Sequence, residues 1–104
     1  MIKMITCDFA ILPVGSETTE CKDYVTAAVQ SIKDSGLNYQ LTGMGTQIES
    51  ENLSELYEAI ANAQEAVFKL GVGRVYTVIK VENRRDAENR TLDAKVDTVN
   101  EMLE

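Results

Sequence analysis

The sequence predicts an α+β fold of the ferredoxin-like type, in which a βαββαβ order forms a four-stranded antiparallel sheet and an extra helix follows at the C-terminus. Segments that alternate between apolar and polar residues, typical of strands, are interleaved with segments whose apolar residues recur every three or four positions, typical of helices. A glycine-rich stretch, Gly43-Met44-Gly45, separates two predicted strands, which indicates a central hairpin. The 104 residues suit one unit, so we expect residues 1–104 to form a single domain.

The first third of the chain predicts a strand followed by a helix. Residues 2–12 alternate, and one side of the strand would carry Ile5, Cys7, Phe9 and Ile11. A helical period then runs from about Thr19 to Ser35. Thr18 or Thr19 can cap its start, and Gly36 is placed to end it in the left-handed conformation. The predicted apolar stripe of this helix is Cys21, Val25, Ala28, Val29 and Ile32.

The middle of the chain predicts the hairpin and the second helix. Residues 37–42 alternate as a strand, the glycines reverse the chain, and Thr46 to Glu49 form a short third strand. Asn52 with Glu55 resembles a capping box, which begins a helix. The helix continues to Gly71 with apolar residues at spacings of three and four, namely Leu53, Leu56, Ile60, Ala63, Val67 and Leu70.

The last third predicts a strand, a charged loop and a short helix. Residues 74–82 alternate with apolar residues on both sides, so we expect this strand to be covered on both faces. Residues 82–90 are charged and loop-like. A terminal helix over Thr91 to Glu104 would place Leu92, Val96, Val99 and Leu103 on one side.

The composition limits the classes of partner. Lys and Arg total 10 against 17 Asp and Glu, a net charge of -7, which disfavours binding to nucleic acids and to anionic membranes. No apolar run approaches the ~20 residues that cross a bilayer, and the N-terminus lacks a secretory pattern. We therefore expect a soluble protein of the cytoplasm.

The side chains available for chemistry are few. The chain contains no histidine, which excludes Ser-His-Asp and Cys-His nucleophilic sites and all imidazole metal sites. Cys7 and Cys21 lack the paired spacing of zinc ligands, and we expect free thiols in a reducing compartment. Any catalysis would have to rest on carboxylates, lysine, tyrosine or arginine. We expect no metal, no cofactor and no catalytic residues.

The predicted fold leaves one face of its sheet bare. That face would carry Met4, Ala10 and some of Tyr76, Val78 or Met44. Soluble proteins rarely expose such a patch. Pairing of two sheets face to face in a dimer would bury it.

Several segments together resemble the small thiamine-binding-protein family, the single-domain branch of the YkoF-like group. They are "ILPVG", "YVTAAVQSIKDSGLNYQLTGMGTQIE", "ANAQEAVFKLGVGRVYTVIKVENRRD" and "TLDAKVDTV", and they cover nearly the whole chain in order. The combination of "GMGTQIE", "EAVFKLGVGRV" and "NRRD" carries most of the specificity. The chain departs from the family pattern at Gly43, where relatives often have proline, and at Gln64, where many have histidine.

The resemblance implies a non-enzymatic binding or carrier protein for thiamine or its hydroxymethylpyrimidine half. It also implies a ferredoxin-like domain that dimerises through its sheets, with dimers pairing into a homotetramer. The ligand pocket would lie between helices and sheet or near the subunit junction.

The stretch "TGMGT" supplies the first candidate site residues. Met44 offers a polarisable surface to a flat ring, and Gly45 lets the backbone approach closely. Thr42 and Thr46 offer hydroxyls that donate and accept. The alternative is a simple hairpin turn with threonines at the strand ends.

Two carboxylates and two guanidiniums complete the candidate set. Glu49 can accept from an exocyclic amine or pair with a thiazolium, or it can be a solvated strand-end residue. Asp8 interrupts an apolar strand, where a charge must be paired or solvated, so it can face the ligand or an arginine across a dimer. Arg84 and Arg85 suit an anion, an interface or an ion pair within the chain.

Two further functions stay open from the residues alone. One is an oligomeric regulatory or assembly module that binds another small metabolite or an anion at a subunit interface. The other is an enzyme that uses Glu49 or Asp8 as a base, for which the sequence offers no clear second titratable group.

Overall fold

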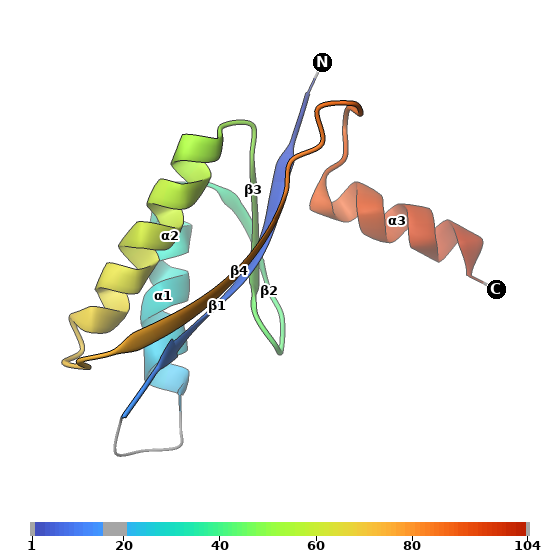
Figure 1. The fold of residues 1–104 in the computed structure, drawn as a ribbon. Coiled ribbons are helices and arrows are strands. Elements are labelled where there is room, and N and C mark those ends of the chain that lie inside the picture. Colours follow the sequence, from blue (N-terminus) through green and yellow to red (C-terminus); the bar gives the residue numbers. More distant parts are fainter. Residues whose placement is uncertain (1, 16–20, 104) are drawn as a thin grey trace.

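The chain adopts the predicted fold class in a computed structural model that describes residues 2–15 and 21–103. The described part contains three helices and one four-stranded antiparallel sheet (Figure 1). In chain order the elements are β1 (Ile5–Pro13), α1 (Lys22–Ser35), β2 (Asn38–Leu41), β3 (Thr46–Ser50), α2 (Leu53–Phe68), β4 (Val75–Glu82) and α3 (Leu92–Met102). The predicted βαββαβ order with a terminal helix is confirmed.

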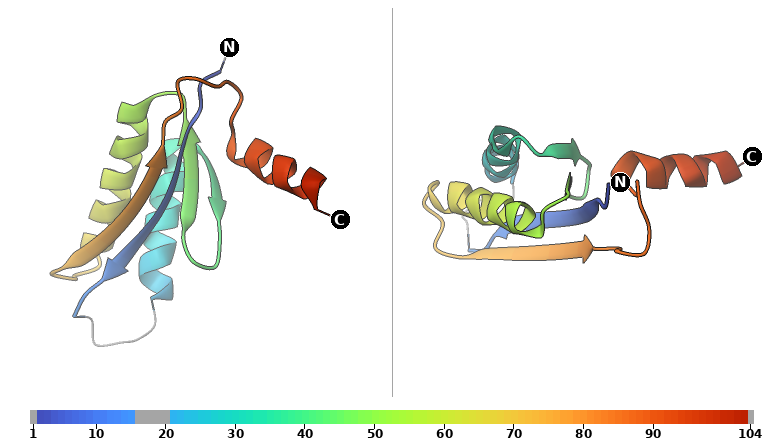
Figure 2. Two further views of the ribbon diagram at one scale, coloured as in Figure 1. Left: turned by 45° about the vertical axis from the view of Figure 1, so that its right-hand side comes forward. Right: turned by 90° about the horizontal axis from the view of Figure 1, so that it is seen from above.

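The sheet has the strand order β2-β3-β1-β4, and each neighbouring pair is antiparallel. Helices α1 and α2 lie side by side on one face of this sheet, and α3 lies on the other side and points away from it (Figure 2). The sheet therefore has one face covered by two helices and one face that a single helix touches.

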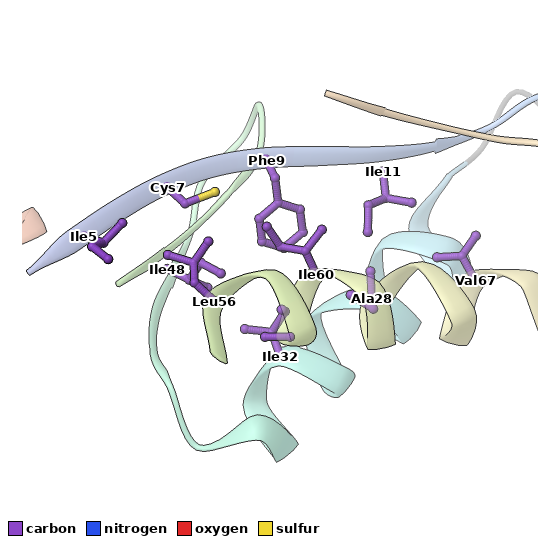
Figure 3. Packing of buried hydrophobic residues seen from close by; sticks show 12 residues of the cluster. Ile5, Cys7, Phe9, Ile11, Ala28, Ile32, Ile48, Leu56, Ile60 and Val67 are labelled. Atoms are coloured by element: carbon purple, nitrogen blue, oxygen red, sulfur yellow. The ribbon is translucent and has the colours of Figure 1, made fainter. Parts of the chain in front are cut away.

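The hydrophobic core fills the space between the sheet and helices α1 and α2. Alternate residues of β1 point from the sheet toward the helices (Figure 3), because successive side chains of a strand face opposite sides. Helix residues spaced by three and four positions meet them. The buried apolar residues are Ile5, Cys7, Phe9, Ile11, Ala28, Ile32, Ile48, Leu56, Ala59, Ile60, Ala63 and Val67.

The helix ends follow the predicted capping residues where the structure describes them. Asn52 Oδ1 accepts a hydrogen bond from Glu55 N at 3.1 Å and begins α2. Gly36 has a φ of 81°, the left-handed conformation expected at the end of α1. The predicted caps Thr18 and Thr19 lie outside the described residues.

The expectation that the last strand is covered on both faces is wrong for the single chain. Strand β4 is an edge strand, and Tyr76 and Val78 on one side and Ile79 on the other are all exposed. Helix α3 reaches only the C-terminal end of β4, where Lys95 meets Glu82. An apolar strand edge is thus left uncovered.

The part of the chain that the structure describes has no helix with both the length and the apolar character that crossing a bilayer requires.

Candidate functional site

The side of the sheet away from α1 and α2, here called the open face, is polar at one end and apolar at the other. At the polar end, Glu49 and Glu82 flank Thr6, and Gln47 and Lys80 flank Asp8. Directly paired strand residues place their side chains on the same face, so these groups form two adjacent polar rows. At the other end lies the apolar row, which consists of Ala10, Leu12, Tyr76 and Val78.

Helix α3 is attached to the polar end by hydrogen bonds from its first turns. Leu92 N donates to Glu49 Oε1 at 2.7 Å, and Gln40 Nε2 donates to Asp93 Oδ1 at 2.7 Å. No described residue of α3 is buried. The attachment of α3 is therefore polar rather than hydrophobic.

Lys95 extends this attachment across two strands. Its Nζ donates to Thr6 Oγ1 at 2.9 Å on β1 and to Glu82 Oε1 at 2.6 Å on β4. The hydrogen bond and the positive charge of Lys95 hold the pKa of Glu82 below its usual value. Glu82 and Lys95 therefore form an ion pair beside the pocket described next.

A cavity of about 510 Å³, the open-face pocket, lies beneath the start of α3. Its polar lining comes from Thr6, Asp8, Gln47, Lys80, Glu82 and Lys95. Gln47 Nε2 donates to Asp8 Oδ2 at 3.2 Å, which leaves the half-buried carboxylate with further acceptor capacity. Lys80 stands directly opposite Asp8 in the register, and no ion pair joins the two among the described residues. The pocket therefore presents hydrogen-bond acceptors and donors side by side.

Cys7 contributes to the wall of this pocket but is not reactive. Its side chain points into the core. Burial, together with the adjacent Asp8 carboxylate, raises the pKa of the Cys7 thiol to about 11. The thiol is therefore protonated at neutral pH and acts as a small apolar side chain.

The "TGMGT" stretch lines a second concavity, the hairpin crevice, of about 250 Å³ between the β2–β3 turn, β1 and α1. Thr42, Met44, Gly45 and Thr46 all take part in its wall, with apolar groups such as Phe9 opposite. Met44 is 92% exposed at the tip, whereas Thr46 is buried. The four predicted residues are thus brought together at a concavity, although Met44 extends almost entirely into solvent.

Thr42 and Gly45 close the turn on each other. Thr42 N and Oγ1 both donate to Gly45 O, at 2.9 and 2.8 Å, and Gly45 N donates to Thr42 Oγ1 at 3.2 Å. The Thr42 hydroxyl is therefore used inside the turn.

Gly45 connects the two concavities by its close approach to β1. A Cβ at this position would lie 2.7 Å from Asp8 Oδ1 and 3.0 Å from Phe9 O. Gly45 does not have a positive φ, so it is the contact with β1, not the turn geometry, that requires glycine here. The hairpin backbone consequently rests against the carboxylate of the open-face pocket.

The other sequence-predicted residues have partners within the chain. Glu49 is buried and accepts from Asn38 Nδ2 at 2.6 Å as well as from α3, so it is not a solvated strand-end residue. Arg84 forms a two-point ion pair with Asp86, at 3.1 and 2.9 Å, which confirms the alternative of an intrachain pair. Each partner favours the charged form of the other, so the pKa of Asp86 is lowered and that of Arg84 is raised. Arg85 accepts from the Lys3 ammonium through its carbonyl oxygen.

Sequence reasoning missed Gln47, Lys80 and Lys95 as site residues. Lys80 gave a usable signal, because it is a charge in the middle of an apolar strand, as Asp8 is. Lys95 gave none, since it belongs to a helix whose position over the sheet depends on contacts far apart in the sequence.

A sequence profile of the family described as "Thiamine-binding protein" matches residues 7–100 of the chain. A UPF0045 protein of Methanothermobacter thermautotrophicus is 44% identical over 96% of this chain and 100% of its own length. A UPF0045 protein of Bacillus subtilis is 41% identical over 97% of this chain and 99% of its own length. Among solved structures, a hypothetical protein of Methanocaldococcus jannaschii is similar with a TM-score of 0.84 at 28% identity, over 96% of this chain and 99% of that one.

Proposed function

The chain belongs to the thiamine-binding protein family, and on that premise we propose that it is a non-enzymatic binding protein for thiamine or its hydroxymethylpyrimidine half. The observation that carries the proposal is the family profile. It extends over residues 7–100, which include the hairpin crevice, every lining residue of the open-face pocket except Thr6, and most of α3. The cytoplasmic location stays a prediction from the sequence.

The open-face pocket fits such a ligand better than the hairpin crevice does. Small-molecule pockets typically enclose about 300–1,000 Å³. The open-face pocket, at about 510 Å³, falls in this range, and the hairpin crevice, at about 250 Å³, does not. We therefore place the pyrimidine ring in the open-face pocket.

The polar groups of this pocket match the edge of an aminopyrimidine. The Asp8 carboxylate accepts from the exocyclic amine, and the Lys80 ammonium donates to a ring nitrogen. The negative charge of Asp8 also favours the cationic thiazolium of thiamine.

The hairpin residues act on this site through Gly45. Because Gly45 lies against the Asp8 carboxylate, the turn formed by Thr42, Met44 and Thr46 fixes where that carboxylate points. Glu49 serves the site by holding the first turn of α3 over the pocket.

A binding role rather than catalysis is supported by the state of the reactive groups. Glu49 already accepts two hydrogen bonds, and the Cys7 thiol is buried with a raised pKa. Of the other titratable groups that line the open-face pocket, Glu82 and Lys95 are paired with each other, and Lys80 is the group that we place against the ligand.

Isothermal titration calorimetry with thiamine and with hydroxymethylpyrimidine tests the proposal. We expect saturable binding, and we expect Asp8→Asn to weaken it by about 10- to 100-fold, since a hydrogen bond to a charged group contributes about 1.5–3 kcal/mol. Asp86→Asn is the matched control, because Asp86 lies in an exposed loop and pairs with Arg84. Folding of each variant is checked by circular dichroism.

Different outcomes of these titrations test the proposed function and the proposed position of the ligand. Absence of heat at millimolar concentration of either ligand, with folded protein, would contradict the function. If Met44→Ala weakens binding and Asp8→Asn does not, the ligand occupies the hairpin crevice instead.

We propose further that the protein assembles through its open faces into a dimer, with dimers pairing into a tetramer. The exposed apolar row supports this, because a folded chain seldom leaves neighbouring large apolar side chains in water. It equally favours the second candidate function, an oligomeric module that binds a metabolite or anion at the subunit interface. Light scattering with and without ligand distinguishes the two functions, since only the regulatory module is expected to change its assembly mass when the ligand binds.

A further inference from the structure

Arg90 carries a buried hydrogen-bond donor that the chain does not use. Its Nε atom is buried and has no hydrogen-bond partner among the described residues. Buried polar groups are nearly always hydrogen-bonded, so an N–H of this kind is a contact point for a bound group. Because a guanidinium stays charged at all ordinary pH values, the group that suits it is an anion.

The backbone on both sides of Arg90 is fixed. Asn89 has a φ of 57°, in the left-handed region that asparagine tolerates, and its N–H donates to Ile2 O at 2.8 Å. Thr91 Oγ1 accepts from Ala94 N at 3.0 Å and caps α3. Figure 2 shows the loop between β4 and α3 passing beside the N-terminus before it enters the helix. Arg90 is therefore held at the start of α3, at the polar end of the open face.

The polar end is locally cationic around Glu82. The pKa of its carboxyl is lowered by Lys95 most of all, and also by Arg84 and Arg90. Lys95 already pairs with this carboxylate, and Arg84 pairs with Asp86. The charge of Arg90 is thus the one of the three that no ion pair uses. An anion meets a local attraction here even though the chain has a net charge of -7.

Lys95 supplies a second donor at the same place. An ammonium has three N–H donors, and Lys95 uses two of them, on Thr6 and on Glu82. No described residue takes the third, and Lys95 also lines the open-face pocket. Thr6 lies two residues from Asp8 along β1, or about 7 Å. A group held by Lys95 and Arg90 therefore stands in the row next to the one that receives the ring.

These two donors suit a phosphate group. A phosphate has three strong acceptor oxygens, so a single group can accept from a guanidinium and from an ammonium at once. We propose that the polar end contains a phosphate-binding subsite, in which Arg90 Nε and the third N–H of Lys95 donate to the same phosphate.

The subsite names a class of ligand, and this step rests on the proposed function. Within the open-face pocket the Asp8 carboxylate favours a cation, whereas Lys95 and the neighbouring Arg90 favour an anion. A ligand with both charges, a phosphate ester of thiamine, matches this arrangement better than thiamine itself. Free inorganic phosphate is the other source of the same chemistry, and it would occupy the subsite without a ring in the pocket.

Calorimetric titration with thiamine and with thiamine monophosphate tests the class of ligand. We expect the wild type to bind the ester about 10- to 100-fold more tightly, the range that a hydrogen bond to a charged group contributes. Arg90→Gln should bring this ratio close to unity by weakening the binding of the ester. Arg74→Gln is the matched control and should keep the ratio, because it removes the same charge just before β4, whereas Glu82 ends that strand.

The unaltered protein gives a second measurement that needs no organic ligand. The Arg90 Nε–H signal is identified in a nitrogen–proton correlation spectrum by its loss in Arg90→Gln. Addition of inorganic phosphate is expected to shift this signal saturably, and sodium chloride at the same ionic strength to leave it in place. A shift with thiamine monophosphate at concentrations where inorganic phosphate has no effect would identify the ester as the source of the phosphate.

Failure of this inference and failure of the proposed function give different results. Thiamine that binds with no advantage for the ester, together with an unmoved Arg90 signal, would overturn the subsite and leave the proposed function standing. An ester preference that Arg90→Gln keeps would also overturn it. If neither thiamine nor hydroxymethylpyrimidine binds and inorganic phosphate still shifts the Arg90 signal, the subsite stands as a site for free phosphate and the proposed function fails.

Discussion

The two faces of the sheet are made from the same four strands, yet one is buried and the other is largely exposed in the single chain. On the face toward α1 and α2, β1 contributes Cys7 and Phe9 to a closed core. On the open face, β1 contributes Asp8 and Ala10, which remain half-buried. The difference indicates that packing within the chain specifies one face and leaves the other incomplete.

The polar and apolar ends of the open face sharpen this contrast. The polar end is crossed by hydrogen bonds from α3 that tie β1, β3 and β4 together. The apolar end has no such contact among the described residues. A ligand can use the hydrogen-bond donors and acceptors of the polar end. Only another apolar surface can bury the side chains of the apolar end.

The largest expected effect is the difference in stability loss between a truncation on the core face and a truncation on the open face. Ile48→Ala removes a fully buried side chain and should lower the free energy of unfolding by about 2–5 kcal/mol. Val78→Ala, on the open face, should change it by less than about 0.5 kcal/mol at concentrations where the chain is monomeric. Urea denaturation followed by circular dichroism measures both. Equal losses would mean that the open face is packed within the chain, and the contrast between the faces would fail.

An intermediate effect is expected where the hairpin meets the open face. Gly45→Ala would press a methyl group against Asp8 Oδ1 and Phe9 O, and we expect it to destabilise the fold by about 1–3 kcal/mol. Gly43→Ala is the matched control, because nothing lies within 4 Å of its added Cβ and its φ is not positive. It should be neutral or stabilise by up to about 1 kcal/mol. Thermal unfolding compares the pair, and similar midpoints would show that Gly45 does not position Asp8.

The elements could be predicted because each follows from local periodicity and from residues at its ends. Asn52 and Gly36 act as the sequence indicates. The coverage of β4 could not be predicted, because it depends on which strand becomes the edge of the sheet, and strand order is set by contacts distant in the chain.

The candidate site was predictable only in part for the same reason. A charge inside an apolar strand identified Asp8, and two close glycines identified the hairpin. The pairing of Asp8 with Gln47 and Lys80 depends on strand register. The use of Glu49 to hold α3 requires a helix that comes 43 residues later.

The smallest expected effect concerns the ion pair between Lys95 and Glu82, which helps to hold α3 on the polar end. Lys95 lowers the pKa of Glu82 in the folded chain below the value of 4.5 for a free side chain. A carboxyl whose pKa is lower when folded stabilises the fold above its unfolded pKa, and this contribution is lost as pH falls through the folded pKa. The stabilisation is therefore complete at pH 7 and is lost as pH falls below 4.5 and through the lowered pKa of Glu82.

A comparison of wild type with Lys95→Met by urea denaturation at several pH values tests this. The wild type should be the more stable at pH 7, and the gap should narrow as Glu82 becomes protonated. Glu82→Gln should remove the pH dependence of the gap while leaving the hydrogen bond from Lys95 to Thr6. A gap in the free energy of unfolding that stays constant from pH 7 to pH 3 would assign the role of Lys95 to its hydrogen bond with Thr6, and the ion pair with Glu82 would then not hold α3 on the polar end.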